Sequence, residues 1–175
     1  MAAPDNSLAP KAGAGDMFLS VKGAKAGAIN GESLDGKHKN EIEVLSWSWG
    51  MQGKPSLGGG TASGKATIRE LRVVKYVDKA STALMNALRS NEVIKEAVLT
   101  LRKSSKPPLE YLKITINDGR VMSLDVEAGD VSGSPTLLER VAFSFNKVEV
   151  EYTPQGLDGQ PMGSTVFQDQ WGEGS

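Results

Sequence analysis

The segment of this chain with the most suggestive chemistry is 59–65, GGTASGK, which matches the start of a phosphate-binding loop, GxxxxGK. The complete motif continues with Ser or Thr, whose hydroxyl holds Mg²⁺, but this chain has Ala66 there. The loop must also lead into a helix whose N-terminus receives the phosphate. Residues 67–77, TIRELRVVKYV, instead have the composition of a strand. We therefore interpret 59–65 as a glycine-rich loop without a nucleotide site.

The single histidine, His38, lies between two lysines in GKHKN. A catalytic histidine needs a carboxylate that orients its ring and a nucleophile beside it. Asp35 and Glu41 are close in sequence, but they lie in or beside a loop and complete no such set. One histidine without any cysteine also cannot build a zinc site. We predict an exposed loop histidine.

Glu41 and Glu43 are spaced like carboxylates on one face of a strand, an arrangement that glycosidases can use. Because they alternate with Ile42 and Val44, we interpret them as the solvent-facing or interface-facing side of that strand. The acidic residues in 125–130 lack the later glycine and glutamate of an EF-hand calcium loop. We therefore predict no catalytic residue, no cofactor and no metal site.

The composition limits the classes of partner. The chain has 175 residues, of which 39 % are hydrophobic and 23 % are charged, and its formal net charge is −1. This is typical of one globular domain, and it gives no overall attraction to nucleic acid or to an anionic membrane. No apolar stretch of about 18 residues occurs, so we expect no membrane insertion. Residues 1–16 lack the pattern of a secretory signal peptide, and we predict a flexible tail there.

Two segments have the two-residue periodicity of strands and change phase midway. In 41–52 the apolar phase moves between Val44 and Leu45, and in 137–153 it moves after Phe145. A one-residue slip turns the side chains to the opposite face, so we expect a bulge or a strong bend at each point. Such strands predict a mainly β fold, a barrel or two-sheet sandwich whose strands pass from one sheet to the other.

The remaining elements follow from shorter patterns. We expect further strands at 17–22, 66–77, 93–102, 109–117 and 121–127. A tight hairpin turn at Asp118-Gly119 is predicted to join the last two. One short helix is predicted after the capping residue Asp78, with an apolar stripe formed by Ala80, Leu84, Ala87 and Leu88.

Trp47 and Trp49 could form a stacking platform for sugars or bases. They share a face with Leu45 and Met51, which favours a place in the core or in a subunit interface. No basic residues are interleaved with them, which argues against stacking on nucleic acid. A small β domain also has open strand edges that pair readily with another copy. We therefore predict a self-assembling structural protein and not an enzyme.

Several segments together resemble one known family. They are EIEVLSWSWGMQ at 41–52, KYVDKAS at 75–81, LTLRK at 99–103, LEYLKI at 109–114 and FNKVEVEYTPQ at 145–155. In order and spacing they are similar to the haemolysin-coregulated protein (Hcp) family, the inner-tube proteins of the bacterial type VI secretion system. The resemblance covers about 17–155. The N-terminal tail and the loop 129–139, which is less glycine-rich and less acidic, depart from the family pattern.

The resemblance implies a two-sheet β-barrel with one short helix, similar to phage tail tubes. It implies a homo-hexameric ring, and rings that stack into a tube inside a contractile sheath. Further implied partners are a baseplate, a trimeric spike and small effector proteins carried in the ring channel. Export from the bacterial cytoplasm to the extracellular space or a target cell is then achieved by the machine itself, without a signal peptide.

Two sets of residues are predicted to serve assembly. The loops 31–40 and 53–64 are candidates for ring stacking, with the residues Glu32, Asp35, Lys37, His38, Lys54 and Leu57. Strand faces are candidates for core or within-ring contacts, with the residues Trp47, Trp49, Val148, Val150 and Tyr152.

The predicted organisation is a flexible tail at 1–16, an Hcp-like β-barrel domain at 17–155 and a C-terminal extension at 156–175. Phe167 and Trp171 indicate that part of the extension is docked. Two alternatives stay open. One is a ring-shaped effector-binding chaperone in which tube building is secondary, and the other is an enzyme that uses His38 or the 59–65 loop.

Overall fold

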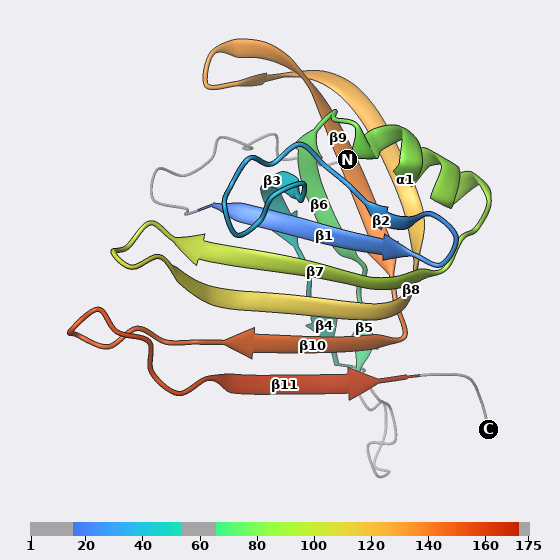
Figure 1. Cartoon of the computed structure of the whole chain (residues 1–175). Coiled ribbons are helices and arrows are strands. Elements are labelled where there is room, and N and C mark those ends of the chain that lie inside the picture. Colours follow the sequence, from blue (N-terminus) through green and yellow to red (C-terminus); the bar gives the residue numbers. More distant parts are fainter. Residues whose placement is uncertain (1–15, 54–65, 172–175) are drawn as a thin grey trace, which may run out of the picture.

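The computed structural model describes residues 16–53 and 66–171 as a mainly β fold with one helix in this part of the chain (Figure 1). The elements in chain order are β1 (Met17–Gly23), β2 (Gly27–Ile29), β3 (Ile42–Ser48), β4 (Met51–Gln52), β5 (Thr67–Ile68), β6 (Leu71–Tyr76), α1 (Ala80–Arg89), β7 (Ile94–Lys103), β8 (Leu109–Val131), β9 (Ser134–Ser144), β10 (Lys147–Tyr152) and β11 (Thr165–Gln170). This agrees with the predicted fold class. The loop 59–65 and residues 54 and 57 lie outside the described residues.

The strands form two layers that share the strands β3 and β8. Sheet A has the order β11-β10-β8-β7-β1-β3, and sheet B has the order β3-β6-β9-β8, so the hydrogen-bonded path returns to β8. All of these pairings are antiparallel. Because β3 and β8 belong to both sheets, the prediction that strands pass from one sheet to the other is confirmed.

The strand β8 turns the corner between the sheets. Its first half pairs with β7 and β10, and its second half pairs with β9. The predicted hairpin turn at Asp118-Gly119 is therefore wrong, because the chain continues as one strand and reverses at Ser132-Gly133 instead. Asp118 does adopt a positive φ of 51°, but this bends the strand without reversing it. A side chain at Gly119 would meet the Ser144 carbonyl at 2.5 Å, so only glycine fits this corner.

The two predicted phase changes lie at the same kind of corner. The register of β3 with β6 shifts between Val44 and Ser46, which confirms the predicted bulge. The predicted strand at 137–153 is divided into β9 and β10, with the break at 145–146. Phe145 and Val148 are both buried on either side of this break, so the predicted change of face is confirmed.

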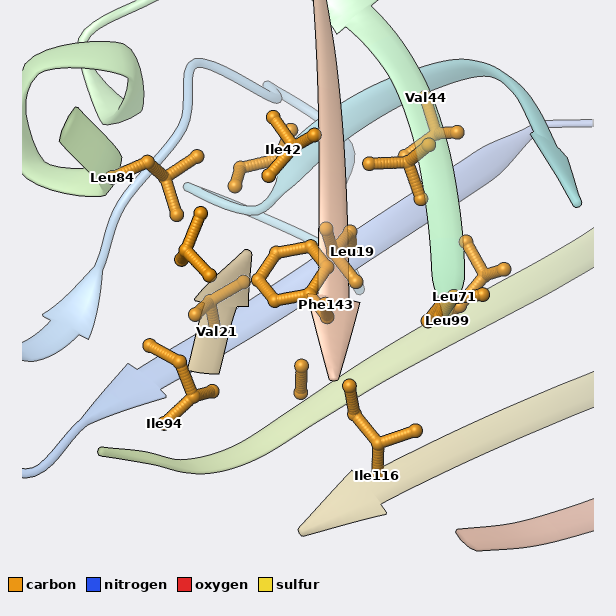
Figure 2. Packing of buried hydrophobic residues seen from close by; sticks show 14 of the residues in the cluster. Leu19, Val21, Ile42, Val44, Leu71, Leu84, Ile94, Leu99, Ile116 and Phe143 are labelled. Atoms are coloured by element: carbon orange, nitrogen blue, oxygen red, sulfur yellow. The ribbon is translucent and has the colours of Figure 1, made fainter. Parts of the chain in front are cut away.

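The core lies between the two sheets and under α1 (Figure 2). Leu19 from β1, Leu99 from β7 and Phe143 from β9 have no exposed surface, and Leu84 closes the core from the helix side. On α1, Ala80 also is fully buried, as the predicted apolar stripe requires. Burial of apolar surface from every element of the ring is the main source of stability.

A buried ion cluster fixes the start of α1 to sheet B. Lys75 of β6 and Glu139 of β9 have no exposed surface, and the Lys75 ammonium lies 2.5 Å from Glu139 Oε2 and 2.9 Å from Asp78 Oδ1. The Ser81 hydroxyl donates to the same Glu139 oxygen at 2.8 Å. Asp78, one residue before the N-cap Lys79, accepts the N–H of Ala80 with Oδ1 at 2.9 Å and so satisfies the first N–H of the helix. Charge pairing, capping and strand pairing therefore meet at one point.

Lys75→Met should destabilise the fold by about 3–5 kcal/mol, because it leaves the Glu139 and Asp78 carboxylates without their buried cation. Chemical denaturation at neutral pH measures this difference. The double variant Lys75→Met/Glu139→Leu should recover much of the loss, since it removes both partners of the pair. If Lys75→Met were as stable as the wild type, the buried Lys75–Glu139 pair would not be a stabilising contact.

Candidate functional site

The loop 31–40 is anchored to strand β7 of sheet A by an ion pair. Both terminal nitrogens of the Arg102 guanidinium on β7 donate to the Asp35 carboxylate, Nη1 to Oδ1 at 3.0 Å and Nη2 to Oδ2 at 2.6 Å. Nη2 also donates to Asp16 Oδ2 at 2.7 Å. The Arg102 guanidinium and the backbone N–H groups of Lys37 and His38 hold the pKa of the Asp35 carboxyl well below its usual range. The same carboxylates raise the pKa of Arg102. Asp35 is therefore an anchor of this loop and is ionised at neutral pH.

His38 is buried, with 7 % of its surface exposed, so the prediction of an exposed loop histidine is wrong. Its ring stacks on Phe18 of β1 with 4.3 Å between the ring centroids. Nδ1 lies 2.9 Å from Glu41 Oε2, and Nε2 lies 3.1 Å from Glu110 Oε1 on β8. The sequence could not place Glu110, which is 72 residues away. Both ring nitrogens therefore contact carboxylate oxygens, and the two carboxylates fix the orientation of the ring. This is the geometry of an anchor and not of a Ser-His-Asp triad, in which one ring nitrogen faces the serine hydroxyl.

The exposed surface of the loop is left to other residues. Glu32 and Lys37 are exposed, and Glu32 Oε2 accepts the N–H of Lys79 just before α1, at 3.0 Å. Leu34 has 90 % of its surface exposed at the same loop. The sequence analysis missed Leu34, although an apolar residue within the polar run GESLDGKH was a usable signal.

The predicted core or within-ring residues separate into two groups. Trp47 and Trp49 are partly buried and pack against the core from the β3 side. Val148 is fully buried and Val150 partly so, whereas Tyr152 at the end of β10 is 46 % exposed. Core packing therefore accounts for the first four, and Tyr152 is the exposed member of these five predicted residues.

The strand β11 forms the outer edge of sheet A next to β10 (Figure 1). All six of its residues are exposed, and they include the apolar Val166 and Phe167. Trp171 packs on Phe145 with 5.5 Å between the ring centroids. The backbone N–H of Trp171 donates to the Asn146 carbonyl at 2.9 Å. The second backbone edge of β11 has no strand partner among the described residues, and such an edge favours pairing with another chain.

A groove of about 310 Å³ lies on the outer face of sheet B, across β3, β6, β8 and β9. Its side chains carry both signs of charge and several hydroxyl groups. Arg72 pairs with Glu70 and Arg140 with Glu127, each at 2.9 Å. Its lining residues with charged or hydroxyl side chains are Ser46, Ser48, Arg72, Ser123, Asp125 and Arg140. The sequence analysis missed this groove, because it is assembled from strands distant in sequence.

Residues 16–53 and 66–171 contain no candidate metal site and no candidate membrane-spanning helix. No group of three or more His, Asp or Glu side chains there has the geometry to hold a metal ion. No helix there is long and apolar enough to span a membrane.

A protein-family model described as "Type VI secretion system effector, Hcp" matches residues 18–152, which span the closed ring of strands. The chain belongs to the Hcp family of type VI secretion proteins. It is 40 % identical over 154 residues to the protein hcp1 of Pseudomonas aeruginosa strain PAO1, across 86 % of this chain and 91 % of that protein. The predicted resemblance is thereby confirmed.

Solved structures agree with this family assignment. Hcp1 from Salmonella typhimurium is 34 % identical, with a TM-score of 0.71 over 90 % of this chain and 95 % of that one. A type VI secretion system effector from Yersinia pestis is 32 % identical, with a TM-score of 0.68 over 89 % of this chain and 99 % of that one. The residues that the family model matches, 18–152, include loop 31–40 and the strands β3, β6, β8 and β9 that line the groove.

Asp35→Asn should lower the melting temperature of this Hcp chain at pH 7, because it removes the charge that Arg102 pairs with. A carboxyl with a lowered pKa stabilises the fold above its ordinary value of about 3.9, and this contribution is lost as the pH falls toward the lowered value. The difference in melting temperature between Asp35→Asn and the wild type should therefore become smaller toward pH 2. An Asp125→Asn control on the exposed face of sheet B should melt like the wild type. Equal melting of Asp35→Asn and wild type at pH 7 would refute the anchor.

Proposed function

We propose that the chain forms hexameric rings that stack into the inner tube of a type VI secretion system. A contractile sheath on a baseplate then propels the tube, beneath a trimeric spike, from the bacterial cytoplasm into the extracellular space or a target cell. The observation that carries this proposal is the family match over 18–152, which spans the closed ring of strands. Residues 17–155 form the tube domain, with 156–175 as an extension.

Ring closure uses the edge of sheet A. The strand β11 offers unpaired backbone groups beside the exposed side chains of Val166 and Phe167, and Tyr152 lies at the end of the neighbouring β10. A head-to-tail contact of this edge with a different surface of the next copy closes by rotation into a ring. Shared strand hydrogen bonds and buried apolar area make this the more stable of the two contacts.

Stacking uses the loop 31–40. Leu34 is almost wholly exposed, while Asp35 and His38 fix the loop beneath it to the barrel wall. A loop that is anchored at its base and apolar at its tip suits a contact with a second ring, since little order is lost on binding. The small size of this patch makes stacking weaker than ring closure and dependent on concentration.

Two substitutions separate these contacts. Tyr152→Asp should give a folded protein that no longer forms rings, because it places a charge at the ring edge. Leu34→Asp should keep the rings and lose end-on stacking. Light scattering gives the mass, and negative-stain microscopy shows rings and tubes.

Met85→Asp, an exposed apolar position on α1, serves as the control and should behave like the wild type. A wild-type monomer at micromolar concentration would refute the tube proposal. Intact rings from Tyr152→Asp would move ring closure to another surface.

The groove on sheet B favours a second candidate function, a ring-shaped chaperone for small effectors in which tube building is secondary. Its mixed charges and hydroxyl groups suit a hydrated protein surface better than an apolar ligand. On this proposal the groove faces the ring channel and contacts the cargo there. Because Arg72 is largely exposed and its removal leaves the core intact, it is the side chain to test.

Arg72→Glu should reduce binding of a purified small effector from the same bacterium by about tenfold, because it reverses the sign of one charge that faces the cargo at the rim of the groove. Isothermal calorimetry with preformed rings measures the affinity. Lys95→Glu on β7, another exposed strand position, is the matched control. Unchanged affinity of Arg72→Glu would place the cargo elsewhere.

A further inference from the structure

The imidazole of His38 is held between two carboxylates that belong to different parts of the chain. Glu41 is three residues away and lies at the start of β3, whereas Glu110 belongs to β8 and is a long-range contact. The ring also stacks on Phe18 of β1 at an interplanar angle of 9°. His38 therefore joins loop 31–40 to two strands of sheet A that the loop does not otherwise reach through its backbone.

The protonation state of the ring decides how many of these contacts are favourable. A neutral imidazole has one N–H and one lone pair, so it donates to one carboxylate and presents its lone pair to the other. A doubly protonated ring donates to both, and each bond is charge-assisted. We propose that His38 is a pH-sensitive clamp, which holds loop 31–40 against β8 when doubly protonated and releases it from Glu110 on losing one proton.

Glu110 is the contact that is released, for a geometric reason. The Nδ1 contact with Glu41 is local and shorter, at 2.9 Å, so the remaining N–H stays with Glu41. The Nε2 contact with Glu110 is 3.1 Å long and then pairs a lone pair with a carboxylate oxygen. Loss of the proton thus breaks the contact between His38 in the loop and Glu110 on β8. The contact between His38 and Glu41 stays intact.

Other charged groups around the ring do not replace this clamp. Arg102 on β7 is occupied by Asp35 and Asp16. Lys113 lies 3.7 Å from the second oxygen of Glu110 and its side chain is 42 % exposed, so it screens that carboxylate weakly. Lys37 and Lys39 flank His38 in sequence and are exposed. The imidazolium is therefore the main cation that faces Glu41 and Glu110 in the described part of the chain.

The second anchor of the loop does not respond over the same pH range. The pKa of Asp35 is held low and that of Arg102 is raised, so this pair stays ionised from acidic to alkaline pH. Release at His38 therefore opens one side of the loop, near 38–40, while Asp35 keeps the other side in place. The device is a hinge and not a general unfolding of the loop.

The sign of the pH response follows from the proton count. The clamp is complete while the ring carries both protons, and it weakens as a rising pH removes one of them. The consequence that ring stacking weakens as the pH rises rests on the proposed tube function, whereas the clamp itself does not.

Hydrogen exchange of the assembled protein tests the clamp. The N–H groups of Ser33, Asn40 and Glu41 are hydrogen-bonded within the loop, so their exchange reports its opening. Their protection factors, corrected for the intrinsic effect of pH, should fall about tenfold between pH 5.5 and pH 8, as expected for loss of one charge-assisted bond. The amide of Leu99 in the core strand β7 should stay unchanged.

Glu110→Gln separates a clamp from a merely structural contact. An amide can accept from an N–H or donate to a lone pair, so it bonds the ring in either protonation state. This variant should fold normally and lose the pH dependence of loop protection. Glu32→Gln, in the same loop but away from the ring, is the matched control and should keep the wild-type response.

Because the chain has a single histidine, NMR of the ring nitrogens reports the titration of His38 without ambiguity. Equal loop protection at both pH values in the wild type, or a wild-type response from Glu110→Gln, would overturn the clamp. Light scattering of the same samples distinguishes the two proposals. A pH-sensitive loop in a protein that never forms rings would sink the tube function and leave the clamp standing.

Discussion

The constraint on which the rest of this structure depends is the closure of one hydrogen-bonded path through two sheets. Two layers of strands can bury a common core only if their edges are also satisfied, and here β3 and β8 satisfy them by belonging to both layers. Each passage needs a local distortion. The bulge between Val44 and Ser46 supplies one, and the bend at Asp118-Gly119 supplies the other. Core packing, the position of α1 and the surfaces proposed for assembly all depend on these corners.

Closure also decides where polar interactions are found. The Lys75–Glu139 pair lies where β6, β9 and α1 meet. The Lys75 ammonium has several partners there, and Glu139 Oε2 accepts from both Lys75 and Ser81, while Glu139 Oε1 is buried without a partner among the described residues. The His38 and Arg102 contacts lie on the opposite layer, where loop 31–40 folds back over sheet A. Each cluster also holds an element that the strand ladder does not pair, which is α1 in the first case and loop 31–40 in the second. They fix the helix and the loop to the closed ring of strands.

Sequence periodicity predicted the strands and their changes of face, because side-chain alternation is a local property of β1, β3 and β10. It failed at Asp118-Gly119, where the dipeptide typical of a hairpin turn serves as a corner in a strand of 23 residues. It also failed at His38. Burial of that ring depends on Phe18 and Glu110, which no local pattern associates with it. The groove on sheet B was beyond prediction for the same reason, since four strands distant in sequence line it. Family resemblance supplied what periodicity could not, namely the architecture as a whole.

The continuity of β8 has a mechanical consequence. A strand that runs unbroken from one layer into the other connects them through covalent bonds, and not only through side-chain contact. A push applied along sheet A is therefore transmitted to sheet B by the backbone itself. The hydrogen bonds on either side of β8 then share the load along their ladders as shear, instead of opening one at a time from an end. A subunit built in this way deforms as a single elastic body, and two layers joined only by a loop would slide past one another.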